Sequence, residues 1–288
     1  MKFELPGQFK PNPKNERIDT NSPEHKRDFE KMTSFTRQIY EDLKKENIPV
    51  ESDCRIDMNA FVEDYNSREM VRKDREEVRY CEDMFYGQLG WREREKRKKN
   101  TWGEKLEVLK TAVFHKFLRG EFVVARSSRY DDIKNGIDNV IMDKTNGNVI
   151  CALDEVDVIS GDVFQKKERK ILEKDLRGGA TLKYGLSVKE DKESQKLSIN
   201  KTTIKNIPTF YLALPVDYID HGMKEFIPDL DESSQYEKDL FKFFVGLIKN
   251  QIQALKLDPQ LPPELGKRIE QFQESLSRIN IKTEEKKY

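Results

Sequence analysis

The stretch at residues 129–155, RYDDIKNGIDNVIMDKTNGNVICALDE, predicts two β-strands joined by a tight turn. Asn146-Gly147 is a strong hairpin signal, because a type I′ turn requires positive φ at both central residues. Apolar runs at 140–142 and 149–153 flank the turn. Since these runs are nearly continuous rather than alternating, we expect both strands to lie in a sheet that is covered on both faces.

Hydrophobic periodicity extends this hairpin into a chain of mixed helices and strands. Apolar residues recur at steps of three and four in the segments that we expect to be helical: 23–46, 57–87, 102–118, 162–176, 233–255 and 262–279. Runs rich in β-branched and aromatic residues predict strands at 121–127, 136–144, 148–158, 180–188, 196–205 and 209–214. This order favours the α/β (α+β) class, with a central mixed sheet covered by N- and C-terminal helices.

The same order divides the chain into regions. Residues 1–22 are polar and contain three prolines, so we expect a disordered arm. We expect a helical N-terminal region at 23–100, a mixed α/β core at 101–215 and a C-terminal helical region at 216–288. The pattern leaves open whether the terminal helices form separate domains or wrap the sheet.

Composition narrows the class of protein without indicating a partner. Lys plus Arg and Asp plus Glu balance at 53 each, so only a local patch of charge can direct binding to nucleic acid. Three cysteines without a CxxC spacing argue against a disulfide framework or a structural zinc site. The N-terminus lacks a secretory signal, and no apolar run reaches the ~18 residues of a membrane span, so we expect a cytoplasmic protein with no membrane partner.

Acidic residues at both ends of the predicted hairpin suggest chemistry. A two-residue turn places Asp138 opposite Glu155, whereas a three-residue loop with a bulge places it opposite Asp154. In either register two carboxylates face each other across the ladder, with about 5 Å between their Cβ atoms. Because like charges that close are unfavourable without a cation or a proton, we expect a divalent metal, Mg²⁺ or Mn²⁺.

Residues 102–188 resemble the PD-(D/E)XK nuclease-like core. They comprise the helix at 102–118, the three strands that follow it, and the next helix and strand. The resemblance implies hydrolysis of phosphodiester bonds with a bound Mg²⁺. It also implies a set of carboxylate ligands, which would be Asp138, Asp154 or Glu155, and Glu107 or, as a weaker choice, Glu104.

This chain departs from the family pattern at one position. The family has a lysine two residues after the second acid, where it orients the attacking water, but here that position is Val156 or Asp157. A lysine from elsewhere would have to replace it: Lys167 on the helix at 162–176 is our choice, with Lys166, Lys170 and Lys183 as alternatives, and Gln165 is a further polar candidate.

A basic segment at 91–99, WREREKRKK, is the best candidate for contact with DNA. Phosphates would bind Arg94, Arg97, Lys98 and Lys99, with a flanking tryptophan stacked on a base. The alternative interpretation is a charged helix end or loop without a partner. We also interpret Asp131 and Asp132 as members of a polar loop, and His115 as a structural residue on its helix.

These observations leave three hypotheses of different kinds. The first is a divalent-metal-dependent nuclease acting on DNA, or a catalytically degenerate relative of one. The second is a non-enzymatic module that binds protein or nucleic acid and associates with a partner or with itself through its terminal helices. The third is an unrelated enzyme.

Overall fold

A mixed sheet with helices on either side of it organises the part of the chain that the structure, a computed structural model, describes. That part comprises residues 20, 22–63, 68–87, 93, 101–147, 149–156, 161–190 and 197–278. The predicted arm at 1–22 therefore lies almost entirely outside the described residues.

The central sheet has the strand order β1-β2-β3-β6 within the described residues. Its strands are β1 (Phe122–Arg126), β2 (Asn139–Asp143), β3 (Val149–Val156) and β6 (Thr209–Ala213). The first three pair antiparallel, and β6 pairs parallel to β3. All residues of β1 and β2 and residues 151–154 of β3 are buried, which confirms, for these residues, the expectation that the hairpin strands are covered on both faces.

A second, two-stranded sheet lies beside the central one. It consists of β4 (Ala180–Glu190) and β5 (Leu197–Ile207), which form an antiparallel pair between the helix α6 and β6 in chain order. The mixed α/β class is therefore confirmed, but the sequence pattern did not separate the two sheets.

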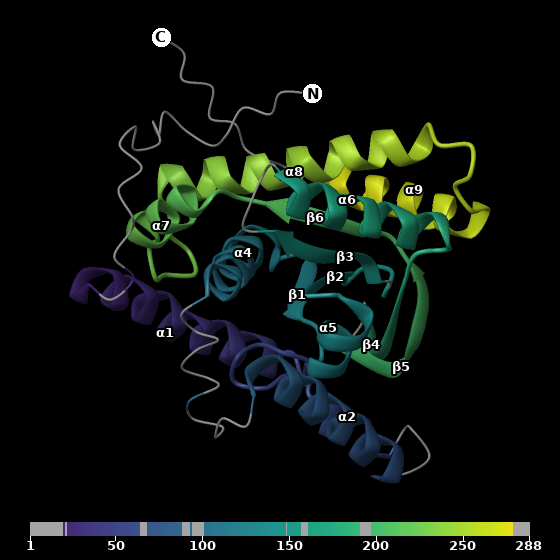
Figure 1. Cartoon of the computed structure of the whole chain (residues 1–288), viewed down its shortest axis with the longest axis horizontal. Coiled ribbons are helices and arrows are strands. Elements are labelled where there is room, and N and C mark those ends of the chain that lie inside the picture. The colour runs from purple at the N-terminus through teal and green to yellow at the C-terminus, as the bar shows by residue number, and fades with distance from the viewer. Residues whose placement is uncertain are drawn as a thin grey trace.

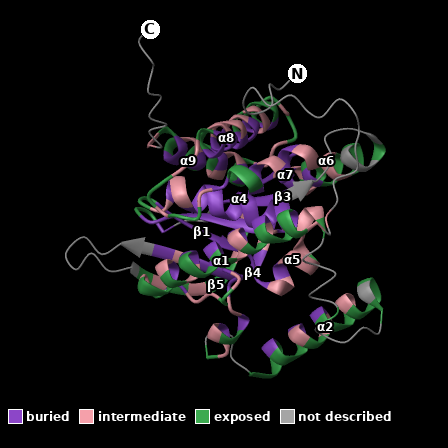
Figure 2. Cartoon of the chain, turned by 90° about the vertical axis from the view of Figure 1, so that its left-hand side faces the viewer, coloured by how far each residue is buried: buried purple, intermediate pink, exposed green. Residues whose placement is uncertain are grey.

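Helices cover the central sheet from several directions (Figure 1). Their bounds are α1 Pro23–Lys45, α2 Arg68–Tyr86, α4 Trp102–Leu118, α6 Gly161–Leu176, α7 Val216–Glu225, α8 Gln235–Lys256 and α9 Pro263–Arg278. The helix α4 packs against β1 and carries α1 on its outer side, whereas α6 and α8 pack against β6 and α9 against β3. Buried residues concentrate in the sheet and α4, while α2 extends away from the body of the molecule (Figure 2).

Two helical segments of the structure differ from the prediction. The expected helix at 57–87 is a short 3-10 helix, η1 (Met58–Phe61), followed by α2, with residues 64–67 outside the described part. The helix α7 lies in the expected C-terminal helical region, but its ten residues carry too short a periodic pattern to predict a separate helix.

The expected polar loop around Asp131 is wrong, because residues Arg129–Asn135 form a short helix, α5. Ser128 caps it by accepting a hydrogen bond from the Asp131 amide, and Gly136 ends it in the left-handed conformation. The buried Asp131 carboxylate also accepts the backbone N–H groups of Lys183 and Tyr184 at 2.8 and 3.1 Å. Asp131 therefore joins α5 to β4, a contact that local sequence does not reveal.

The Asn146-Gly147 turn packs closely against β4. Gly147 has φ of 73°, and an added Cβ atom would lie 2.6 Å from the carbonyl oxygen of Val188. The Ser187 hydroxyl donates a hydrogen bond to the Gly147 carbonyl. Glycine is thus required here both by backbone conformation and by the approach of the neighbouring strand.

We expect Gly147→Ala to lower the free energy of unfolding by about 1–3 kcal/mol, because it combines strain at positive φ with a steric clash. The matched control is Gly246→Ala in α8, where an added Cβ meets nothing within 4 Å; it should be neutral or stabilise by up to about 1 kcal/mol. Urea unfolding of both variants tests this. Equal stability of the Gly147 variant and the wild type would contradict the close contact with β4.

Candidate functional site

The pairing of β2 with β3 selects between the two predicted registers. Asn139 pairs with Leu153 and Val140 with Ala152, and a bulge follows between Ile141 and Met142. One step beyond the first pair, the Asp138 amide donates a hydrogen bond of 2.9 Å to the Leu153 carbonyl. Continued by one residue, this register brings Asp138 next to Asp154, whose charge acts on it, and not to Glu155, whose side chain lies outside the described part.

Asp138 is in an environment that disfavours its charge. Burial raises the pKa of Asp138 well above its usual range, and the neighbouring carboxylates of Asp154, Asp132 and Glu107 raise it further. The backbone that positions it is the short stretch between the Gly136 cap of α5 and the first residue of β2. The fold therefore holds the carboxyl groups of Asp138 and Asp154 close enough to raise the pKa of Asp138.

Lys167, our predicted replacement for the missing family lysine, lies at this site. Its Nζ atom is 2.6 Å from Oδ1 of the buried Asp154, and its side chain remains partly exposed. The alternative Lys183 instead binds Asp74 at 2.6 Å and lies over the ring of Tyr130. The helix α6 therefore supplies Lys167 as an ion-pair partner of Asp154.

A second lysine at the site, Lys110 on α4, was missed by sequence reasoning. It is completely buried, and burial lowers its pKa to about 8, against the opposing influence of Asp138, Glu107 and Asp154. Lys110 follows Glu107 by three residues, so both side chains lie on the same face of the helix. That spacing was visible in the sequence, but only the fold shows that this face points toward Asp138.

Glu107, predicted as a metal ligand from the helix, is held by two buried arginines. Its carboxylate accepts hydrogen bonds from Arg55 Nη2 at 2.9 Å and from Arg126 Nε at 2.7 Å. Glu104, the weaker candidate, accepts a hydrogen bond from Arg126 Nη2 at 2.9 Å. Both helix carboxylates are therefore already neutralised by cations of the chain itself.

Arg55 enters the site from a segment distant in sequence. The segment forms a bridge to β1, in which the Arg126 amide donates to the Cys54 carbonyl and the Ile56 amide donates to the Arg126 carbonyl, both at 3.0 Å. Arg55 also contacts Asp132 at 3.0 Å, so Asp132 is part of this ion-pair network. A single arginine in a polar stretch carries no sequence signal of such a role.

The remaining predicted residues are placed as follows. His115 is buried and binds Asp42 at 3.0 Å, in line with the expected structural role. Lys166 and Lys170 point to solvent, and Gln165 lines a separate cavity between α6 and α8. The proposed DNA-binding residues Arg94, Arg97, Lys98 and Lys99 lie outside the described residues.

The donor set suits a hard divalent cation only in part. Carboxylate oxygens are the ligands that Mg²⁺ prefers, and Asp138 and Asp154 face each other. Among the residues that the structure describes, however, no three His, Cys, Asp or Glu side chains are grouped to hold a metal ion. Glu107 and Asp132, the other described carboxylates that act on Asp138, are ion-paired with arginines of the chain itself.

No family model, curated protein or solved structure matches this chain. Within the described residues, every helix is too short or too polar to cross a membrane.

Arg55→Ala should destabilise the fold by about 3–5 kcal/mol, because it removes one of the two cations that hold the buried Glu107 carboxylate and, at the same time, the arginine paired with the half-buried Asp132. The control is Arg72→Ala, which removes an exposed arginine paired with Glu69 and Glu76 on α2; no measurable loss is expected. Thermal and urea unfolding give both values. Similar losses of stability in the two variants would show that the buried ion pairs contribute no more to the free energy of unfolding than the exposed ones.

Asp138→Asn should be more stable than the wild type at pH 8, and this difference should shrink as the pH falls to about 4, the usual pKa of an aspartate. A carboxyl whose pKa is raised by folding stabilises the protein while protonated, and that stability is lost as pH rises toward the folded-state pKa. Melting temperatures of both proteins across this pH range test the sign. A stability difference between the two proteins that grows toward low pH would refute a raised pKa for Asp138.

Proposed function

We propose that this chain is a divalent-metal-dependent nuclease that hydrolyses phosphodiester bonds in DNA. The observation that carries the proposal is the pair of neighbouring carboxylates, Asp138 and Asp154, with Lys167 at 2.6 Å from the second acid and the buried Lys110 close enough to interact with both. Crowded like charges that raise a pKa beside two lysines are typical of catalytic sites.

The chain order supports the resemblance to the PD-(D/E)XK nuclease-like core. A helix (α4) precedes the antiparallel strands β1, β2 and β3, with the short α5 between β1 and β2, and β6 pairs parallel to β3. The strand expected to complete the core at 180–188 is β4, but β4 pairs with β5 in the second sheet, so β6 is the strand that would complete the core. The β4–β5 hairpin is an insertion between α6 and β6. In this proposal the insertion packs against the Asn146-Gly147 turn and does not interrupt the strands next to Asp138 and Asp154.

Each group has a role in the proposed reaction. Asp138 and Asp154 would hold Mg²⁺ or Mn²⁺, which supplies Lewis-acid activation of a water molecule. Lys110 is mostly protonated at pH 7, because its pKa is about 8, so it offsets negative charge on an incoming phosphodiester. Lys167 lies partly exposed on the same side as Asp154, where it replaces the family lysine as the cation that meets the scissile phosphate.

One observation favours the second candidate, a catalytically degenerate relative that binds nucleic acid or protein. Arg55 and Arg126 neutralise Glu107, the carboxylate that the family would use as a third ligand. A protein partner would find apolar surface on α2, where Tyr80, Met84 and Phe85 are largely exposed. A cytoplasmic location belongs to both candidates.

Metal-dependent cleavage of plasmid and single-stranded DNA tests the proposal. Asp138→Ala should lower the Mg²⁺- or Mn²⁺-dependent rate by about 10²- to 10³-fold, the usual loss when one group of a preorganised site is removed. The control Glu270→Ala removes an exposed carboxylate from α9 and should keep full activity. Equal activity of the wild type and the Asp138 variant would end the nuclease proposal, and DNA binding without cleavage would favour the degenerate relative.

A second set of variants distinguishes the role of Lys167 from that of Lys110. Lys167→Met should lower the rate by about 10²-fold or more if Lys167 meets the phosphate, while Lys170→Met, one turn away on the exposed face of α6, should leave it unchanged. Lys110→Met tests the buried lysine in the same assay. A loss confined to Lys110→Met would transfer the role of the family lysine from α6 to α4.

A further inference from the structure

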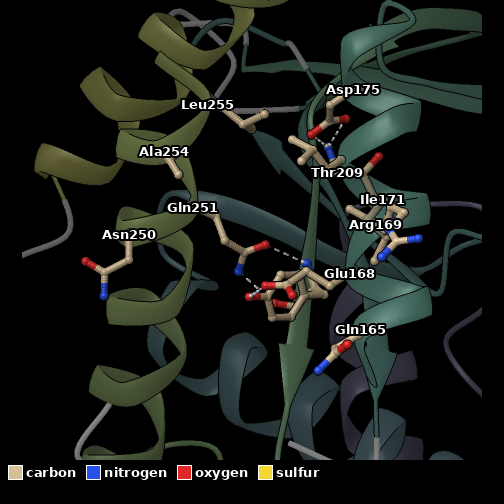
Figure 3. Close-up of a pocket in the computed structure, with 12 residues that line it drawn as sticks. Gln165, Glu168, Arg169, Ile171, Asp175, Thr209, Asn250, Gln251, Ala254 and Leu255 are labelled. Carbon is tan, nitrogen blue, oxygen red and sulfur yellow. Dashed lines mark hydrogen bonds between the residues drawn. The ribbon is translucent and has the colours of Figure 1, made fainter. Parts of the chain in front are cut away.

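A cavity of about 700 Å³ opens between α6, β6 and α8 (Figure 3). Its walls include Gln165, Glu168 and Leu172 from α6 and Asn250 and Ala254 from α8, and Tyr211 of β6 lies at its floor. This volume is in the range of small-molecule sites, about 300–1,000 Å³.

The floor of the cavity is rigidly organised. The Gln251 side chain accepts a hydrogen bond from the Tyr211 amide at 3.0 Å and donates one to the Tyr211 carbonyl at 2.9 Å. The Asp175 carboxylate accepts the Thr209 amide at 3.0 Å. Side chains from both helices thus satisfy outward-facing backbone groups of the edge strand β6, and Figure 3 shows both contacts. A cavity held in this way is formed before a ligand arrives.

The two acidic residues that line the cavity, Glu168 and Asp175, attract a cationic ligand less than their number suggests, because both are engaged by groups of the chain itself. Burial raises the pKa of Asp175 to about 8, so this group is mostly uncharged at pH 7. Glu168 accepts a hydrogen bond of 2.7 Å from the Tyr211 hydroxyl. At the rim, Arg169 is exposed, and the amides of Gln165 and Asn250 both donate and accept hydrogen bonds. An uncharged heterocycle attached to an anion matches this lining.

The cavity is adjacent to the acid pair. Asp154 on β3 pairs in register with Tyr211 on β6, and neighbouring strands are separated by about 4.8 Å. Consecutive residues of α6 contact these two positions, since Lys167 binds Asp154 and Glu168 binds the Tyr211 hydroxyl. A ligand that spans the N-terminal half of α6 therefore reaches both places.

We propose that this cavity binds the nucleoside next to the phosphodiester bond held at Asp138 and Asp154. The base lies against the Tyr211 ring and the apolar side chains of Leu172 and Ala254, and the amides of Gln165 and Asn250 contact its polar edge. The inference rests on the proposed nuclease function for the placement of the phosphate, but nucleoside binding itself is independent of catalysis.

Binding without metal tests the cavity alone. NMR titrations of the four deoxynucleoside 5′-monophosphates should show binding to the wild type, and Ala254→Trp, which fills the cavity from its exposed rim, should weaken it by about tenfold or more, the worth of one base-stacking contact. Gln253→Trp, exposed on the same helix but not lining the cavity, is the matched control and should bind like the wild type. Absence of binding to the wild type, or equal binding by Ala254→Trp, overturns the proposal.

Turnover separates this inference from the proposed function. Bis(p-nitrophenyl) phosphate has no nucleoside, whereas the p-nitrophenyl ester of thymidine 5′-monophosphate has one. With Mn²⁺, Ala254→Trp should raise KM for the thymidine ester by about tenfold and leave hydrolysis of the bis ester unchanged. Equal effects on both esters count against a nucleoside site. If the wild type hydrolyses neither, the nuclease proposal fails, and the binding titration alone decides the cavity.

Discussion

The buried ion-pair network around Glu107 is the interaction on which the rest of the structure depends. Glu107 on α4 lies between Arg126 of β1 and Arg55 of the segment after α1, and Arg55 continues to Asp132 of α5. Charges removed from water are costly unless each has its partner, so these four elements are stable only together. The network joins the N-terminal helical region to the α/β core, and it borders the acid pair.

The same network determines which cations can balance the charge of Asp138 and Asp154. Because the arginines neutralise Glu107, the charge at Asp138 and Asp154 is offset by the lysines Lys110, Lys167 and Lys174. The raised pKa of Asp138 shows that burial and the neighbouring acids are not fully offset. A site with uncompensated negative charge of this kind gains stability when a cation binds, and that gain is the physical basis of the proposed metal-dependent chemistry.

The helix α6 connects this chemistry with the cavity beside it. One face carries Lys167 to Asp154, and the adjoining face carries Glu168 and Asp175 to the edge strand β6. Because β6 is an edge strand, its outward backbone groups need partners, and side chains of α6 and α8 provide them. The protection of an edge and the floor of a ligand-sized cavity thus come from the same contacts.

The sequence by itself determined the elements whose signal is local. Helix periodicity predicted α4, and the apolar runs around Asn146-Gly147 predicted the β2–β3 hairpin, because side-chain spacing and turn chemistry act within a few residues. It reached Asp138 and Asp154 as candidates but left their register open, since the bulge that pairs them depends on how β3 packs. Only the tertiary structure separated the β4–β5 sheet, turned the loop at Asp131 into a helix and brought Lys110 and Arg55 to the site. Those outcomes depend on contacts between residues far apart in the chain, and no local pattern encodes which buried charges will meet.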